Sequence, residues 1–244
     1  MQLVQVLTLL SICLVVYSYK ILIICPFPGR SHCKIFESIS LSLMDKQHNV
    51  TFLSYFPIKG NHTSLDLRQP GHSYLNFLDM GMFTGTKLQR WLVMNMAQTF
   101  GKEICEQDFR TDKIRKFLND SGPFDVIVTQ MFTSDCYLSF MHKFEAPVVG
   151  VSTFGIMEWV CEKFGLPSNP GYVPNVFSDL VNPITFARRI DNFLMGIFQR
   201  LYYENLMASN GEKTAKEYFG EGLPSLSKIA FNVSMLLVNA HFNY

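Results

Sequence analysis

Tyr19-Lys-Ile-Leu-Ile-Ile-Cys-Pro-Phe-Pro-Gly-Arg-Ser-His32 is the stretch that decides the fold. Its apolar run, residues 21–25, predicts a buried strand, and the two prolines and the glycine that follow predict a tight turn. A helical pattern then begins at His32. In open α/β sheets, ligands bind just beyond the carboxyl ends of the strands. A histidine in the first turn of this helix is therefore the first candidate for a functional residue.

The residues after this stretch extend the pattern to strand, helix, strand. Ile35, Ile39 and Leu43 recur at a spacing of four, so an amphipathic helix is predicted from about 32 to 47. A second strand is predicted over 50–53. A unit of this length forms a right-handed crossover between two parallel strands. The predicted fold class is α/β, with a Rossmann-like parallel sheet flanked by helices.

Later segments repeat this alternation of strands and helices. The sequence predicts strands over 124–129, 146–151 and 234–239, helices over 88–104, 109–118 and 184–219, and an irregular loop over 56–85. Asp135 falls in the polar turn after the strand 124–129. Because the carboxyl ends of parallel strands meet at one edge of a sheet, we expect Asp135 to lie near His32.

Charge and motif content narrow the classes of function. The 244 residues carry a formal net charge of +1 and no basic run, so there is no electrostatic case for binding nucleic acid. The first turn holds one glycine instead of G-x-G-x-x-G, and the six histidines lack metal-ligand spacing. We therefore predict no metal site and no bound cofactor. The five cysteines after residue 18 are too few and too scattered to predict a disulfide framework.

The N-terminus has the pattern of a signal peptide. A short apolar segment, 7–16, is followed by Tyr17 and Ser18, so residues 1–18 are predicted to be a leader cleaved near Ser18. No later run of about 18 apolar residues predicts a transmembrane helix. The mature chain, 19–244, is expected to enter the secretory pathway. Its sequons predict glycosylation at Asn61, Asn119 and Asn232.

Residue chemistry leaves two roles open for His32. The positive end of a helix dipole disfavours imidazolium, and a neutral imidazole near pH 7 can accept a proton from a hydroxyl. A carboxylate on a neighbouring loop, such as that of Asp135, would orient the ring and stabilise the charge. The alternative is a solvated histidine on a turn, with no part in chemistry.

The segment 184–219 also leaves two interpretations open. An apolar stripe runs along it through Phe186, Ile190, Phe193, Ile197 and Leu201. The arginines of the segment, at 188, 189 and 200, lie largely off this stripe. The pattern fits a helix that packs on the sheet, and it also fits a helix in interfacial contact with a membrane.

At these residues the sequence resembles the animal UDP-glycosyltransferases, the UDP-glucuronosyltransferase family, and particularly their arthropod members. The resemblance runs through residues 23–32, 48–51, 124–127, 134–136, 170–174 and 236–242. It implies a GT-B architecture, in which two Rossmann-like domains face each other across a cleft. Residues 19–244 resemble only the N-terminal, acceptor-binding domain. The C-terminal domain that binds the UDP-sugar in that family, and its transmembrane helix, have no counterpart in this sequence.

The resemblance also implies roles for individual residues. His32 falls on the family's catalytic histidine, which deprotonates an acceptor hydroxyl so that its oxygen attacks a UDP-sugar with inversion. An ungapped match puts Gln130 at the position of the family's partner aspartate, and a glutamine cannot stabilise imidazolium as a carboxylate does. We therefore nominate Asp135, the nearest ionisable residue, as the partner. Phe27, Phe132 and Phe154 are expected to line the acceptor site, with ordinary core packing as the alternative.

The predicted function is hexosyl transfer from UDP-glucose or UDP-glucuronate to a small lipophilic hydroxyl compound. The resemblance places this activity in the lumen of the endoplasmic reticulum, in proteins that are membrane-associated at full length. The alternative is a truncated, inactive form that binds acceptors or pairs with full-length subunits in a homo- or hetero-oligomer. Because the donor site lies mostly in the missing domain, the chain alone is expected to be inactive.

Overall fold

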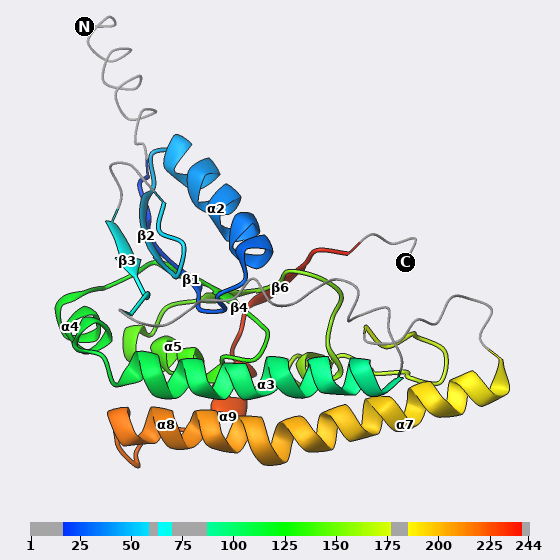
Figure 1. The fold of residues 1–244 in the computed structure, drawn as a ribbon. Coiled ribbons are helices and arrows are strands. Elements are labelled where there is room, and N and C mark those ends of the chain that lie inside the picture. The colour runs from blue at the N-terminus through cyan, green and yellow to red at the C-terminus, as the bar shows by residue number, and fades with distance from the viewer. Residues whose placement is uncertain (1–16, 59–62, 70–86, 177–184, 241–244) are drawn as a thin grey trace, which may run out of the picture.

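A computed structural model shows a single parallel sheet between layers of helices (Figure 1). It describes residues 17–58, 63–69, 87–176 and 185–240. The strands are β1 (Lys20–Cys25), β2 (Asn49–Ser54), β3 (Thr63–Asp66), β4 (Val126–Gln130), β5 (Val148–Ser152) and β6 (Met235–Val238). They pair in the order β3-β2-β1-β4-β5-β6, and every neighbouring pair is parallel. The predicted α/β fold class is confirmed.

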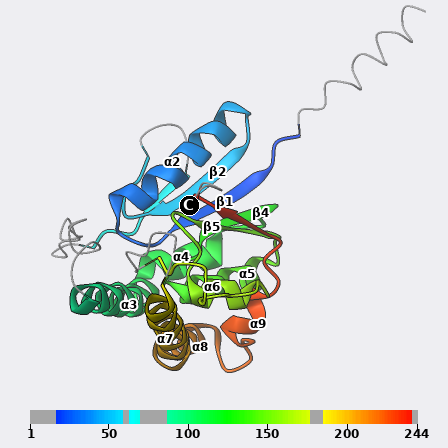
Figure 2. The ribbon, with the colours of Figure 1, turned by 90° about the vertical axis from the view of Figure 1, so that its right-hand side faces the viewer.

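The helices form two unequal layers. They are α2 (Arg30–Asp45), α3 (Lys87–Phe109), α4 (Asp112–Asp120), α5 (Ser139–Phe144), α6 (Glu158–Lys163), α7 (Phe186–Tyr202), α8 (Ser209–Phe219) and α9 (Leu226–Ala230). A 3-10 turn, η2 (Asp135–Leu138), precedes α5, and a π-helical segment, η3 (Tyr203–Ala208), joins α7 to α8. Figure 2 shows α2 alone on one face of the sheet and α3, α5 and α6, with α7 and α8 beyond them, on the other.

The central strands β1, β2, β4 and β5 are buried on both faces, as their apolar composition predicts. Alternate side chains of β1 enter different cores. Leu22 and Ile24 belong to a large core shared with α3, α5 and α9, whereas Ile21 and Ile23 belong to a smaller core beneath α2. Among the described residues, no helix is both long enough and apolar enough to cross a membrane.

The strand order puts a switch point between β1 and β4. The chain leaves β1 toward β2 on one side and leaves β4 toward β5 on the other, although β1 and β4 are neighbours. In register, Ile24 of β1 lies beside Thr129 of β4. Doubly wound sheets bind ligands in the crevice that opens at such a point, because the connecting loops diverge there. The segments after β1 and β4 therefore define where a site is expected.

Two features differ from the sequence predictions. The loop predicted over 56–85 contains β3, a half-exposed edge strand whose polar composition hides it. Two disulfides, Cys25–Cys33 and Cys105–Cys136, correct the expectation that the cysteines form no framework. Their Cα atoms lie 5.9 and 5.8 Å apart because the fold brings different elements together. The odd count is explained by Cys161, which is free.

Candidate active site at the switch point

His32 lies in the first turn of α2, just beyond the carboxyl end of β1, as predicted. The turn before it needs a glycine at position 29. A Cβ atom on Gly29 would come 2.9 Å from the Phe27 ring and 3.2 Å from Cδ2 of His32. Real Cβ atoms essentially never come within 3.0 Å of another heavy atom, so a larger residue here would displace the Phe27 ring and would also press on His32.

The other two strands at the switch point supply the partners of His32. Nδ1 of its ring lies 2.6 Å from Nε2 of Gln130 and 2.7 Å from Oγ1 of Thr153. Gln130 is the last residue of β4, and Thr153 directly follows β5. Within the described ranges, both hydrogen-bonding contacts of the ring use Nδ1. Nε2 is therefore the nitrogen left for a substrate hydroxyl.

Both partners of Nδ1 are electrically neutral. For Nε2 to accept a proton, Nδ1 must carry the hydrogen and donate it to a neighbour. The hydroxyl oxygen of Thr153 can accept it, and so can the carbonyl oxygen of the Gln130 amide when that oxygen faces the ring. Neither group stabilises an imidazolium as a carboxylate would. The two partners therefore fix the orientation of the imidazole ring but do not favour its protonated, positively charged form.

Burial keeps the ring neutral. Desolvation lowers the pKa of His32 from 6.5 to about 4, because a charged imidazolium loses its hydration in this apolar setting. At pH 7 the ring is thus an imidazole, the form that accepts a proton.

Three phenylalanines surround the imidazole, and all three were predicted to belong to the site. Their ring centroids lie 4.9 Å (Phe27), 5.4 Å (Phe132) and 5.3 Å (Phe154) from that of His32. They come from the turn after β1, the loop after β4 and the loop after β5. Phe27 and Phe132 are buried, and Phe154 is half-buried. The structure therefore gathers these side chains into one apolar wall around the histidine.

Asp135 does not take part in this cluster: among the described residues, the hydrogen-bond partners of His32 are Gln130 and Thr153. Its carboxylate accepts hydrogen bonds from the Lys163 ammonium and the Tyr203 hydroxyl, and all three side chains are buried. The indole of Trp159 stacks on Tyr203 with ring centroids 4.9 Å apart. The physical reason is that η2 packs against α3, α8 and α9, so this carboxylate faces the helix layer, where Lys163 of α6 and Tyr203 of η3 reach it.

Three buried hydroxyl-bearing residues on the loops after β4 and β5 escaped the sequence analysis, and one of them, Thr153, contacts the histidine. Thr153 was identifiable in principle, because it follows the carboxyl end of β5. Thr133 and Ser134, next to Phe132, are 3% and 6% exposed, and their hydroxyls have no hydrogen-bond partner in the described part of the chain. Gly101 of α3 packs against this segment so closely that a Cβ atom there would lie 2.2 Å from the Thr133 carbonyl oxygen.

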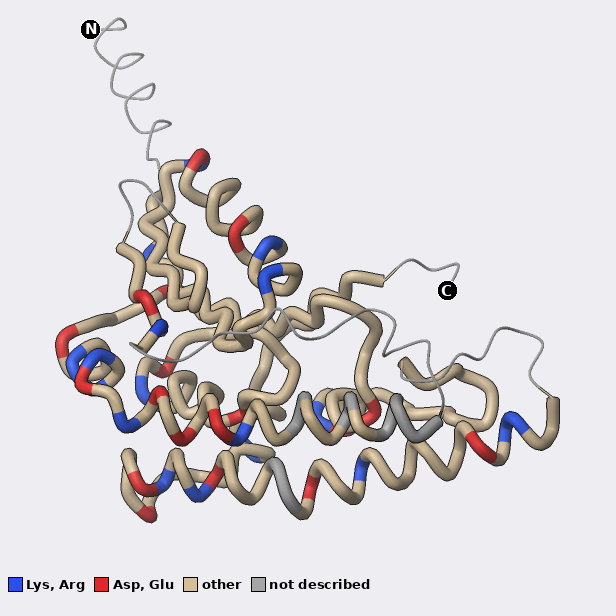
Figure 3. The backbone as a smooth tube through the Cα atoms, in the orientation of Figure 1, with Lys and Arg blue, Asp and Glu red and all other residues tan. Residues whose placement is uncertain are grey.

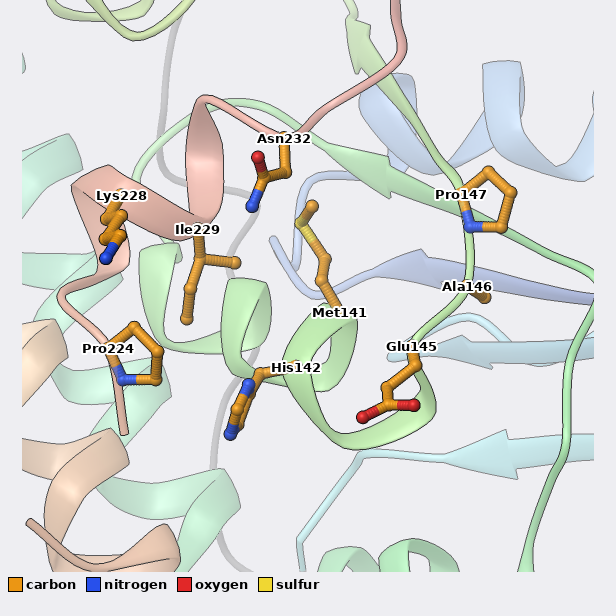
Figure 4. Close-up of a pocket in the computed structure, with 9 residues that line it drawn as sticks. All are labelled: Met141, His142, Glu145, Ala146, Pro147, Pro224, Lys228, Ile229 and Asn232. Atoms are coloured by element: carbon orange, nitrogen blue, oxygen red, sulfur yellow. The ribbon is translucent and has the colours of Figure 1, made fainter. Parts of the chain in front are cut away.

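A separate concavity lies at the opposite edge of the sheet (Figure 4). It is lined by Met141, His142, Glu145, Ala146, Pro147, Pro224, Lys228, Ile229 and Asn232. Residues 145–147 precede β5 and Asn232 precedes β6, which places the concavity at the amino ends of the strands. It is therefore distinct from the His32 site. Its exposed Asn232 is one of the predicted glycosylation sites.

The chain is therefore a doubly wound α/β domain with an aromatic-lined histidine at its switch point, the position at which such sheets bind small molecules. The chain belongs to the family described as UDP-glucoronosyl and UDP-glucosyl transferase, whose family model matches residues 26–244. It is 30% identical to UDP-glycosyltransferase UGT5 of Dactylopius coccus over 96% of the chain and 46% of that protein. It is 28% identical to UDP-glucuronosyltransferase 3A1 of Bos taurus over 88% of the chain and 43% of that protein.

The chain spans less than half the length of these curated relatives, consistent with an N-terminal half. Among solved structures, the glycosyltransferase SnogD from Streptomyces nogalater matches 57% of this chain and 36% of its own, with a TM-score of 0.33 and 16% identity. The fold assignment rests on the sheet itself and on the family match.

Proposed function

We propose that this chain forms the acceptor side of a UDP-glycosyltransferase and that His32 is its catalytic base. The carrying observation is a neutral imidazole enclosed by three phenylalanines, held at Nδ1 by Gln130 and Thr153. An apolar wall with one oriented proton acceptor suits a small lipophilic molecule that carries a hydroxyl. Phe27, Phe132 and Phe154 would contact its apolar body.

The reaction that fits this arrangement is a single displacement. His32 takes the proton of the acceptor hydroxyl at Nε2 as the acceptor oxygen forms a bond to the anomeric carbon of the sugar. The bond from that carbon to the phosphate oxygen breaks, and its electron pair leaves with UDP. Attack opposite the leaving group inverts the anomeric centre. Removing the proton during attack is general-base catalysis, which contributes about 10²- to 10⁴-fold in rate.

The sugar donor that we propose is UDP-glucose or UDP-glucuronate. Relatives of both kinds match the chain: UDP-glucosyltransferase 2 of Dactylopius coccus is 26% identical, and the bovine glucuronosyltransferase is 28% identical. Since the relatives are more than twice as long, we expect the donor site mostly outside these residues. Without it the chain would bind acceptors or pair with full-length subunits but would not turn over, which is the alternative function.

We further propose that the protein resides in the lumen of the endoplasmic reticulum. Two disulfides suit an oxidising compartment. Asn119 and Asn232 are exposed and accessible to glycosylation, whereas Asn61 and the leader segment 1–16 lie outside the described residues. Expression with microsomes followed by endoglycosidase H tests this. Endoglycosidase H should increase the mobility of the wild-type chain but not that of the Asn61→Gln, Asn119→Gln, Asn232→Gln protein, and a wild-type chain whose mobility the enzyme does not change would contradict the proposal.

Substitution of His32 tests the proposed base. The test uses a full-length protein that contains both this chain and a donor domain. There, His32→Ala should lower the rate of sugar transfer to 4-methylumbelliferone by at least 100-fold, because the proton acceptor is lost. Binding of the same phenol, followed by its fluorescence, should change by less than about threefold, since the phenylalanine wall remains. His142→Ala is the matched control, because His142 lies at the opposite edge of the sheet.

Near-normal turnover by His32→Ala would refute the base assignment. An assay of the chain alone separates the two functions. Sustained transfer by residues 19–244 without a donor domain would exclude the inactive, acceptor-binding alternative. Phenol binding with no transfer would support it.

A further inference from the structure

The concavity at the amino ends of β5 and β6 has an apolar floor and a polar rim (Figure 4). The buried side chains of Met141 and Ile229, 7% and 5% exposed, form the floor. The exposed residues His142, Glu145 and Lys228 stand at the rim. The volume is about 350 Å³, at the small end of the range for small-molecule sites. The concavity therefore suits a small ligand that has both apolar and polar groups.

The charges at the rim favour a neutral ligand. Glu145 and Lys228 give the rim one negative and one positive charge. The turn before β6 and β6 itself contain no charged residue (Figure 3). An anion or a cation in the concavity would therefore meet a like charge as well as an opposite one. A sugar avoids this conflict, because its ring is uncharged, carries hydroxyls around its edge and presents C–H groups on its faces.

Asn232 lines this concavity and can itself carry a sugar. It begins the sequon Asn232-Val-Ser234. Its backbone N–H donates to the Ile229 carbonyl at 3.0 Å, and the N–H of Ser234 donates to the Val148 carbonyl at 2.8 Å, so the turn between α9 and β6 is anchored at both ends. Figure 4 shows the Asn232 side chain directed toward Ile229 and Met141. A group attached to its amide nitrogen therefore starts beside the apolar floor.

We propose that Asn232 carries an N-linked glycan whose first N-acetylglucosamine occupies this concavity. The inference rests on the proposed residence in the endoplasmic reticulum, but not on sugar transfer by this chain. In that compartment the amide nitrogen of Asn232 forms a bond to the anomeric carbon of a lipid-linked oligosaccharide. The bond from that carbon to the lipid diphosphate breaks, its electron pair leaves with the diphosphate, and the amide loses one proton. One face of the first sugar then covers Met141 and Ile229, and its hydroxyl and acetamido groups contact the rim.

Attachment makes weak contacts sufficient. A sugar tethered to the wall of its own site has an effective concentration on the order of millimolar or above. Contacts too weak to bind the free sugar can therefore hold the attached one. The other described sequon offers a contrast, because Asn119 is exposed near the end of α4 and is not among the residues that line the concavity.

Enzymatic release of the glycan tests the proposal in the full chain, expressed with its leader in mammalian cells. Peptide N-glycosidase F hydrolyses the bond between asparagine and the first sugar and leaves aspartate, which mass spectrometry measures at each site. A first sugar seated in the concavity is cleaved only from the fraction of molecules in which it has moved out. Release at Asn232 from the native protein should therefore be about tenfold slower than release at Asn119. After denaturation the two rates should agree.

Variants at the rim separate contact with the concavity from general crowding around residue 232. His142→Ala with Lys228→Ala should speed release at Asn232 by about threefold and leave release at Asn119 unchanged, because the rim contacts are lost. Lys143→Ala, at an exposed lysine of α5 outside the concavity, should change neither rate.

Hydrogen exchange gives a second readout, which follows the protein instead of the sugar. Asn232→Gln uncovers the floor and should speed amide exchange over residues 141–145 relative to the glycosylated chain, whereas Asn119→Gln should not. Equal native release rates at the two sites, or a glycan at Asn119 with none at Asn232, would overturn the proposal and leave the proposed residence standing. Slow release at Asn232 that the rim variants do not change would also overturn it. No glycan at either site would overturn both.

Discussion

Gln130 ends β4 and Asp135 lies five residues further on, at the start of η2, and the two side chains have opposite environments. The neutral amide faces the histidine, with Nε2 2.6 Å from Nδ1 of His32. The carboxylate faces away and is buried against Lys163 and Tyr203. A buried carboxylate requires a cation or several donors to offset its lost hydration. The difference places the negative charge in the helix layer and leaves the histidine with neutral partners.

The consequence for chemistry is a weakly basic, oriented imidazole. A carboxylate at position 130 would favour imidazolium, as in catalytic triads. With an amide there, burial acts unopposed and the pKa of His32 falls to about 4. In the proposed reaction, the rate of proton transfer to the ring would depend on how much positive charge the imidazole carries in the transition state. Substitutions at positions 130 and 135, and at the residues that contact them, test this difference.

The largest expected effect is on folding stability, through the buried ion pair of Asp135 with Lys163. Lys163→Met removes the cation and leaves a buried carboxylate beside the Tyr203 hydroxyl, which should lower the free energy of unfolding by about 3–5 kcal/mol. Urea denaturation measures this. Lys143→Met, an exposed lysine on α5, serves as the control. Adding Asp135→Asn to Lys163→Met should restore part of the loss. A cost below about 1 kcal/mol for Lys163→Met would show that this ion pair does not hold the segment.

The next largest effect is the dependence of the free energy of unfolding on pH that His32 causes. Its pKa is about 4 in the folded chain and 6.5 when unfolded, so between these values the unfolded state binds the extra proton. Stability from this group is therefore present above about pH 6.5 and is lost as the pH falls to 4, by on the order of 3 kcal/mol. His32→Gln should abolish this contribution in denaturation curves at several pH values.

The comparison of wild type with His32→Gln also controls for a second titrating group. Burial raises the pKa of Asp108 to about 7, although the Tyr55 and Tyr137 hydroxyls donate to it. Its stabilisation is present below pH 3.8 and is lost as the pH rises to 7, opposite in sign to that of His32. Because both proteins contain Asp108, its effect cancels in the difference. A difference that is flat between pH 4 and 6.5 would contradict the neutral, buried histidine.

The sequence predicts part of this site but not all of it. Local patterns predict the strand, the turn and the histidine in the first turn of the helix. Apolar runs and the prolines and glycines of turns determine structure over only a few residues. The partners of His32 depend on strand order, and Thr153 lies 121 residues away. The choice between Gln130 and Asp135 depends on the path of one loop. Periodicity predicts the apolar stripe of α7, but four of its five side chains are exposed in the structure, so the interpretation that this stripe packs on the sheet is wrong.

A smaller effect tests the charge at position 130 directly. Gln130→Glu keeps the side-chain length and places a carboxylate at Nδ1, so the pKa of His32 should rise from about 4 toward 6, about 10- to 100-fold in proton affinity. Titration of the ring protons by NMR measures this. Asp135→Asn should leave the same titration unchanged, since Asp135 does not contact the ring. A fall in the pKa of His32 in Asp135→Asn would restore Asp135 as an electrostatic partner.

The smallest effect concerns the hydroxyl that shares Nδ1 with Gln130. Thr153→Val preserves the side-chain shape but removes one hydrogen-bond partner of the ring, which should cost about 1 kcal/mol of stability. If Thr153 accepts the Nδ1 hydrogen, the variant should also shift the ring toward the tautomer protonated at Nε2, detected by nitrogen-15 chemical shifts. Thr133→Val is the matched control, because its buried hydroxyl has no partner in the described part of the chain. That variant should be neutral or stabilising, since it removes an unpaired polar group. Unchanged nitrogen shifts in Thr153→Val would leave Gln130 alone as the residue that sets the tautomer.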